Sequence, residues 1–167
     1  MKRTVLVLLS CLVMSTTAFS ESTQSNPLVK LSIQQLMDME ITSVTKTPQP
    51  LSQSAAAIFV ISQEDIRRST ATSIPELLRM VPGMHVARTS SSTWAIATRG
   101  FNGALSNKLL VLIDGRTVYT PLFAGVYWDV QDMVLADIER IEVIRGPGAS
   151  LWGSNAVNGV INIITKK

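Results

Sequence analysis

Short apolar runs separated by polar or glycine-containing loops fill the sequence from residue 55 to its end. The first run, AAAIFVIS (55–62), predicts a buried strand because it is short and rich in branched side chains. LLVLID (109–114) and VINIIT (160–165) are apolar on both faces, so we expect them in the middle of a sheet. The other predicted strands are MHVAR (84–88), WAIATR (94–99), RTVY (116–119) and RIEVIR (140–145).

Two short helices are predicted between the first strand and the second. Ser62 caps SQEDIRRS, which has Asp65 in its first turn. Ser73 caps IPELLRM, and Pro82-Gly83 ends that helix. Strands and helices follow one another without the regular alternation of a βαβ fold. The pattern therefore predicts an α+β fold with a small mixed β-sheet and short helices.

The first twenty residues have the pattern of an export signal. Lys2 and Arg3 precede an apolar stretch from Val5 to Met14, and the segment ends on the small residues Ala18 and Ser20 in the register that a signal peptidase reads. The apolar stretch is shorter than the roughly 20 residues that a membrane-spanning helix needs, which makes a permanent anchor the weaker interpretation. We therefore predict a signal peptide at residues 1–20.

Charge and cysteine content narrow the function classes. Removing residues 1–20 lowers the formal net charge from +3 to +1, that is, 13 Lys and Arg against 12 Asp and Glu. The remaining basic residues are scattered rather than clustered, so no nucleic-acid partner is predicted. Cys11, the one cysteine, lies in the signal, so the mature chain is predicted to have no disulfide and no thiol chemistry.

Catalytic and metal-binding patterns are missing from the sequence. His85 is the only histidine, and neither a base nor metal ligands stand at suitable spacing around it, so we predict a structural role. Glu139 and Glu142 are predicted to be solvated or paired with Arg140. The chain is therefore predicted not to be an enzyme and to carry no cofactor or metal.

Glycines cluster near the end of the sequence. RGPGASLWG (145–153) is followed by Ser154-Asn155 and not by Lys, which argues against a phosphate loop. Glycines there instead predict tight turns packed against other backbone. Two Arg-Gly pairs, Arg99-Gly100 and Arg145-Gly146, each close an apolar strand. Such an arginine either pairs with a carboxylate or reaches solvent, and the residues leave both alternatives open.

A set of motifs in fixed order resembles a known family. PGMHV, ATRGF, VLIDGR, IERIEVIRGP and GSNAVNGVINIIT follow one another between residues 82 and 165. In order, spacing and chain position they are similar to the plug domain of TonB-dependent outer-membrane receptors. The resemblance covers about residues 55–167, implies long apical loops between the strands, and makes residues 55–167 the predicted plug domain.

The resemblance also gives the polar segment before the plug a role. Receptors of this family carry there a short segment that binds TonB in the periplasm as an added strand, and residues 21–54 are predicted to form this flexible arm. An extended β-branched run suits strand addition because its peptide groups are unpaired. The segment that resembles this TonB box is Glu40, Ile41, Thr42, Ser43, Val44 and Thr45.

Two further groups of residues take their roles from the resemblance. Arg99 and Arg145 are implied to dock the plug against glutamates of the barrel wall. The loops at residues 89–93, 101–107 and 119–128 are implied to form the apex that contacts ligand. Aromatic residues in such loops can bind ligand or pack beneath the barrel wall, and both remain open. The implied apex residues are Phe101, Asn102, Tyr119, Phe123, Tyr127 and Trp128.

The function implied by the resemblance is gating of nutrient uptake. We expect the plug of a TonB-dependent receptor for iron complexes such as siderophores, cobalamin or similar nutrients, present here as a fragment or a truncated receptor without its barrel. Its partners would be TonB, the outer-membrane β-barrel and a small-molecule nutrient such as a metal chelate. The alternative is a stand-alone periplasmic module that binds TonB or ligand without a barrel. Localisation would be the outer membrane in the first case and the periplasm in the second.

Overall fold

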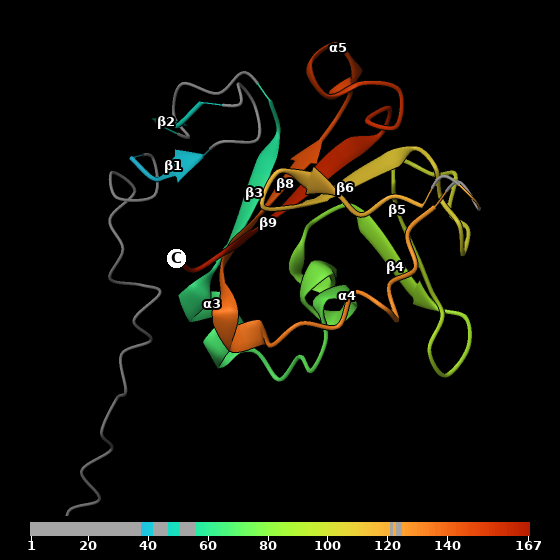
Figure 1. Ribbon diagram of the computed structural model, residues 1–167, viewed down its shortest axis with the longest axis horizontal. Helices are drawn as coiled ribbons and strands as arrows, with labels where there is room; N and C mark the ends of the chain where they lie inside the picture. The colour runs from blue at the N-terminus through green and yellow to red at the C-terminus, as the bar shows by residue number, and fades with distance from the viewer. Residues whose placement is uncertain (1–37, 42–46, 51–55, 121, 123–124) are drawn as a thin grey trace, which may run out of the picture. The chain divides into compact units, whose positions relative to one another are not determined.

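A five-stranded mixed sheet forms the centre of the described chain (Figure 1). The structure is a computed structural model that describes residues 38–41, 47–50, 56–120, 122 and 125–167. All of these belong to one unit, residues 33–167. The strands lie in the order β3 (Ile58–Ser62), β8 (Ile138–Arg145), β9 (Gly159–Thr165), β6 (Leu109–Ile113) and β7 (Arg116–Thr117).

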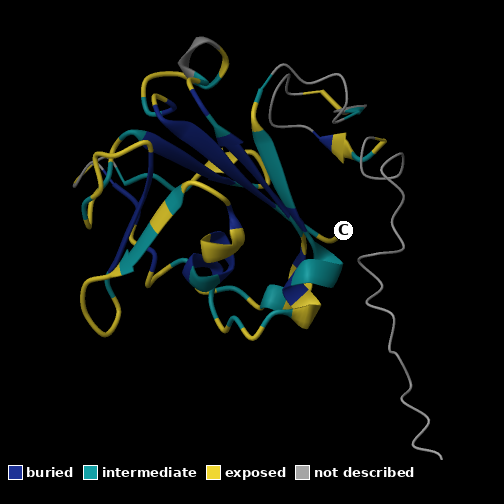
Figure 2. Ribbon diagram, turned by 180° about the vertical axis from the view of Figure 1, so that it is seen from behind, coloured by how far each residue is buried: buried dark blue, intermediate teal, exposed yellow. Residues whose placement is uncertain are grey.

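Strand β9 is the middle of this sheet. It pairs antiparallel with β8 on one side and parallel with β6 on the other. Its first five residues are all buried, as are the first four of β6. The prediction that these two apolar runs lie in the interior of the sheet is confirmed, and both strands are drawn as buried in Figure 2.

Strand β3 differs from its predicted burial. It lies at the edge of the sheet with β8 as its one neighbour among the described strands. Ile61 is fully buried, whereas Ile58, Phe59 and Val60 are half-buried. The apolar run therefore correctly indicated a strand, but an edge position leaves part of each side chain uncovered.

Two smaller antiparallel sheets and the short helices complete the α+β fold, which confirms the predicted fold class. Strand β4 (Met84–Arg88) pairs with β5 (Trp94–Thr98), and β1 (Glu40–Ile41) pairs with β2 (Gln49–Pro50). The helical segments are α3 (Gln63–Arg68), α4 (Ile74–Leu77), η3 (Leu78–Met80), η4 (Leu135–Asp137) and α5 (Ala149–Trp152). Within the described residues, no helix is long and apolar enough to cross a bilayer.

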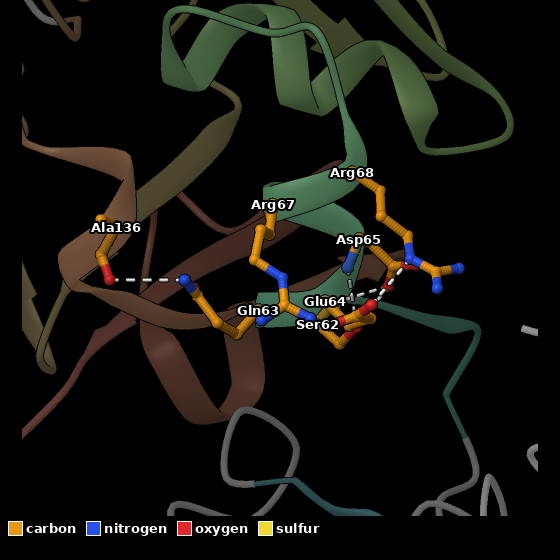
Figure 3. Close-up of polar contacts among 7 residues, drawn as sticks. All are labelled: Ser62, Gln63, Glu64, Asp65, Arg67, Arg68 and Ala136. Carbon is orange, nitrogen blue, oxygen red and sulfur yellow. Dashed lines mark hydrogen bonds and ion pairs between the residues drawn. The ribbon is translucent and has the colours of Figure 1, made fainter. Parts of the chain in front are cut away.

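Helix α3 begins with the predicted cap, and the cap is reciprocal (Figure 3). The N–H of Asp65 donates to Ser62 Oγ over 3.2 Å, and the N–H of Ser62 donates to Asp65 Oδ2 over 2.9 Å. This capping box satisfies backbone donors that the first turn of a helix leaves free. On the same helix, Glu64 pairs with Arg67 and with Arg68.

Helix α4 is capped differently from the prediction. Ser73 occupies the N-cap position, but its side chain accepts no hydrogen bond there. Instead, the carboxylate of Glu76 accepts from the N–H of Thr72 over 2.7 Å and from its hydroxyl over 3.0 Å. These hydrogen bonds, the backbone one foremost, lower the pKa of Glu76.

The sheet separates two apolar cores. The larger contains Ile141 and Val143 of β8 together with residues of α4, β5 and β6. The smaller contains Ile144 of β8 and Val160 of β9, with Trp152 of α5 packed against it. Consecutive residues of β8 thus serve opposite faces, as the alternation of side chains along a strand requires.

Gly159 shows why the final strand begins with a glycine. A Cβ added there would lie 2.3 Å from the carbonyl oxygen of Ile144 and 3.2 Å from a methyl carbon of Leu109. The predicted role of glycine in close backbone approach therefore holds at this position, where β8 and β9 begin to pair.

We expect Gly159→Ala to lower the free energy of unfolding of the full chain by about 1–3 kcal/mol or more, because the obstructing atom belongs to the backbone and cannot rotate away. The measurement is urea unfolding followed by circular dichroism. Gly103→Ala is the matched control, since no heavy atom lies within 4 Å of a Cβ at that position, and we expect it to change stability by less than about 1 kcal/mol. Equal destabilisation by the two variants would contradict the steric argument.

Candidate functional site

The two strand-end arginines meet at one place in the fold. Arg99 follows β5, and Arg145 is the last residue of β8. The Nη2 of Arg99 donates to the backbone carbonyl of Arg145 over 3.1 Å. The Nη1 of Arg145 in turn donates to the carbonyl of Pro82 over 2.8 Å. The turn before β4, the end of β5 and the end of β8 are thereby joined through guanidinium groups.

Neither guanidinium has a carboxylate partner within the described residues, where the ion pairs involve other arginines. The Nε of Arg145 is buried and has no hydrogen-bond acceptor in this part of the chain. A buried donor without an acceptor is costly. The two guanidinium groups can therefore donate hydrogen bonds to an oxygen acceptor from outside the described residues. A carboxylate is the acceptor that fits a guanidinium best.

A third arginine provides a contrast. Arg140, on β8, lies between Glu139 and Glu142, and its Nε is 2.8 Å from Glu142 Oε1. Glu142 is fully buried. The predicted pairing with Arg140 is present, but the alternative of a solvated Glu142 is wrong because β8 lies between two strands of the sheet.

The backbone at Arg99 is unusual. Arg99, Gly100 and Phe101 have φ angles of 56°, 88° and 56°, so three consecutive residues lie in the left-handed region. Two of them carry side chains that disfavour this conformation. Such strain persists only where the surroundings hold it, and it is concentrated at functional sites in proteins. The left-handed segment turns the chain sharply out of β5 into the next loop.

The loop at residues 101–107 contains the most exposed of the predicted apex residues that the structure describes. The side chain of Phe101 is 76% exposed. Asn102 is also exposed, and its Nδ2 contacts Nδ1 of His85 on β4. His85 is itself exposed on β4, and in the described chain its ring is placed near no group of metal ligands.

The aromatic residues of the loop at residues 119–128 differ in burial. Tyr119 is half-buried against the larger core, and burial raises its pKa above the usual 10.0. Tyr127 is 36% exposed. Trp128 is only 7% exposed and belongs to the larger core, which favours the packing alternative for this residue. Phe123 lies outside the described residues.

The two loops touch at Gly125. A Cβ added to Gly125 would lie 2.9 Å from Cα of Leu105, so the backbones of the two loops are in close approach there. The loop at residues 89–93 is a separate tight connection between β4 and β5. In it the N–H of Thr89 donates to the carbonyl of Thr93 over 2.9 Å.

The segment that resembles a TonB box is described in part. Glu40 and Ile41 form β1 and pair with Pro50 and Gln49 of β2. The expectation of unpaired peptide groups is therefore wrong for these two residues, because β2 already supplies them with a neighbouring strand. The remaining residues of this segment, Thr42, Ser43, Val44 and Thr45, lie outside the described residues, as do the predicted signal peptide and most of the predicted arm.

Comparison with known proteins connects this arrangement to a family. The family profile described as TonB-dependent Receptor Plug Domain matches residues 50–160. The chain belongs to this family of plug domains. Its identification from the ordered motifs in the sequence is confirmed, and the α+β sheet described above is the plug fold.

Curated relatives of this plug domain are transporters. The vitamin B12 transporter BtuB of Photobacterium profundum is 35% identical over 167 residues, which is 99% of this chain and 25% of that protein. BtuB of Vibrio vulnificus is 35% identical over 133 residues, covering 78% of this chain and 21% of the relative. The chain thus spans about a quarter or less of the length of these relatives.

Solved structures of receptors contain a similar plug. The siderophore receptor PirA from Acinetobacter baumannii superposes with a TM-score of 0.54 at 30% identity, covering 70% of this chain and 18% of that chain. The ferripyoverdine receptor of the outer membrane of Pseudomonas aeruginosa, bound to ferripyoverdine, gives a TM-score of 0.60 at 19% identity. That match covers 77% of this chain and 16% of the receptor, and at this identity it shows the fold alone.

Sequence patterns did not indicate two buried polar residues beside the loop at residues 101–107. Thr98 and Asn158 are 1% and 7% exposed, and they are hydrogen-bonded to each other. The available signal was weak: each is a polar residue beside an apolar run and directly before an Arg-Gly or Gly-Val step. Burial of a polar group requires a partner, but a sequence does not say which one.

We expect the phenol of Tyr119 to ionise above pH 10, because burial against the core disfavours its anion. Tyrosinate absorbance near 295 nm, recorded during alkaline titration of the full chain and of Tyr119→Phe, isolates this step by difference. Because the pKa of the folded state exceeds that of the unfolded state, the contribution to stability is complete below about pH 10 and is lost as pH rises through the folded-state pKa. A difference titration centred below pH 10 would contradict this placement of the side chain.

Proposed function

We propose that this chain is the gating plug of an outer-membrane receptor that takes up cobalamin, an iron complex or a similar scarce nutrient. The observation that carries this proposal is the pair Arg99 and Arg145, which converge at two strand ends without a carboxylate among the described residues. A protein that folded for itself alone would gain little from a buried, unsatisfied guanidinium nitrogen. A surrounding wall that carries glutamates would satisfy both groups.

The docking role follows from the chemistry of arginine. A guanidinium binds a carboxylate through two parallel N–H donors, and the pair keeps its charge at all physiological pH values. Arg99 and Arg145 each use one terminal nitrogen for a backbone carbonyl, which orients the group and leaves other donors available. We infer that glutamates of the barrel wall occupy these donors and hold the plug in place.

The ligand-contacting role belongs to the exposed part of the apical loops. Phe101 and Tyr127 offer aromatic surface to solvent, and Asn102 offers a polar group beside Phe101. Aromatic rings on otherwise rigid turns suit a large and partly apolar nutrient. We propose that these residues meet ligand first, with Tyr119 supporting the loop from below and Phe123 belonging to the same loop.

We propose that the energy for opening comes from TonB, as membership of the family of TonB-dependent receptor plug domains implies. We propose that Glu40, Ile41, Thr42, Ser43, Val44 and Thr45 bind TonB in the periplasm by strand addition. Within the described residues β1 has β2 as its single neighbouring strand, so a second edge remains for pairing. The export signal at residues 1–20 would bring the chain to this compartment.

We expect proline at Ser43 or Val44 to weaken binding of the full chain to the periplasmic domain of TonB, because proline removes an N–H from the added strand. Ser43→Ala is the matched control and should bind like the parent. Isothermal titration calorimetry provides the measurement. Unchanged affinity in both proline variants, together with unchanged affinity after deletion of residues 21–50, would exclude this segment as the TonB-binding site.

We expect Arg99→Lys and Arg145→Lys to have different effects in two settings. In the chain alone, where no carboxylate partner is present among the described residues, each change should alter stability by less than about 1 kcal/mol. In a vitamin B12 transporter whose own plug is replaced by this chain, each should loosen the plug, because losing one side of a buried pair costs about 3–5 kcal/mol.

Urea unfolding measures the first setting, and leakage of a large antibiotic through the outer membrane measures the second. Arg116→Lys is a matched control, since Arg116 is exposed on the short edge strand β7. Collapse of the chain alone, combined with a receptor that stays sealed, would identify Arg99 and Arg145 as residues of the internal fold and contradict the docking role.

A further inference from the structure

The loop at residues 101–107 is fastened at both of its ends by one buried residue, Asn158. The N–H of Asn158 donates to the carbonyl of Lys108, directly after the loop, over 2.8 Å. Its side-chain Nδ2 lies 3.5 Å from the carbonyl of Gly100, directly before the loop. Asn158 is 7% exposed, so these hydrogen bonds are largely shielded from water.

A third hydrogen bond ties Asn158 to the strand that leads into the loop. The hydroxyl of Thr98, the last residue of β5, donates to the carbonyl of Asn158 over 2.8 Å. Thr98 is 1% exposed. The main chain and the side chain of Asn158 together therefore contact the strand before the loop, the turn into the loop and the residue that leaves it.

The turn that Asn158 fastens is the strained one. Arg99, Gly100 and Phe101 are all left-handed, and a chain free to relax would leave this conformation at the two residues that carry side chains. Arg99 is held from one side by its hydrogen bond to the carbonyl of Arg145. Gly100 is held from the other side by Asn158. The direction in which the side chain of Phe101 points therefore depends on the hydrogen bond of Arg99 and on that of Asn158.

Asn158 is itself fixed in place by its neighbour. Gly159 begins β9, and its backbone lies so close to the carbonyl of Ile144 that a Cβ would not fit between them. Asn158 therefore stands at the entry to the central strand of the sheet, where the backbone is least free to move.

We propose that Asn158 is a positioning residue for the ligand-contacting loop: with Thr98 it holds the left-handed turn and so sets the orientation of Phe101. This role rests on the proposed function, in which residues 101–107 contact the nutrient. The geometry of the fastening itself depends only on this chain. The two can therefore fail separately.

The test is amide hydrogen exchange of the full chain with two variants. Asn158→Leu keeps the size of the side chain and removes its donor, and Thr98→Val keeps the shape and removes the hydroxyl. We expect exchange at residues 100–107 to rise about three- to tenfold in each, the range that corresponds to loss of one hydrogen bond. Amides of β8 and β9 should stay within about twofold of the parent, because their ladders are unchanged.

Two further variants separate positioning from general support of the fold. Thr98→Ser retains the hydroxyl and should restore the exchange of the parent. Asn155→Leu is the matched control, since Asn155 lies in the same glycine-rich stretch and no hydrogen bond of its side chain is found within the described residues. Unchanged exchange at residues 100–107 in both Asn158→Leu and Thr98→Val, or an equal rise throughout β8 and β9, would overturn the proposal. If Asn158→Leu does not fold, Thr98→Val and Thr98→Ser decide the question by themselves.

Binding of vitamin B12 or a ferric siderophore to a receptor carrying this plug distinguishes the two proposals. Loss of loop fastening in Asn158→Leu without any effect of Phe101→Ala on nutrient binding would leave the positioning role intact and contradict the proposed ligand contact. Loss of nutrient binding in Phe101→Ala, together with normal exchange in Asn158→Leu and Thr98→Val, would support the proposed ligand contact and contradict the positioning role of Asn158.

Discussion

The structure depends on one close backbone contact, between the start of β9 and the end of β8. Gly159 approaches the carbonyl of Ile144 so closely that any side chain at that position would force the backbone to shift. This contact sets the register in which β9 pairs with β8, and through β9 it sets the parallel pairing with β6. Because side chains alternate along a strand, that register also decides which residues enter the larger core and which the smaller one.

Arginines beside the same sheet are satisfied in two different ways. Arg140 has its carboxylates within the chain, one of them fully buried, so this charge belongs to the internal fold. Arg99 and Arg145 instead use backbone carbonyls, and within the described residues they find no acid. Arg99 is exposed and Arg145 is half-buried, but the Nε of Arg145 is buried and has no acceptor among the described residues. The difference between these arginines, more than their number, supports an external partner for the second pair.

Apolar periodicity was sufficient to predict the strands of the five-stranded sheet and of the β4–β5 pair, but not β1 and β2. It was most direct for β6 and β9, because strands that are buried on both faces are apolar at consecutive positions. It was insufficient for residues whose position depends on contacts distant in sequence. Trp128 was implied to belong to the ligand-contacting apex, with packing as the alternative, and it lies in the larger core beside Ile96 of β5 and Val111 of β6. Glu142 was open to a solvated interpretation until β8 was known to lie between two strands. Asn158 gave only a weak local signal, since its hydrogen-bond partners lie about 50–60 residues earlier in the chain.

The residues proposed for docking and for ligand contact share one stretch of backbone, and this has a physical consequence. Arg99 is the first residue of the left-handed turn, and Phe101 is the last. A carboxylate that pulls the guanidinium of Arg99 away from the carbonyl of Arg145 removes one of the two contacts that hold the turn. Strain released at Arg99 must then be taken up at Gly100 or Phe101, because β5 is buried and cannot rotate. The orientation of an exposed aromatic ring is therefore coupled, through two peptide units, to whatever satisfies the arginine.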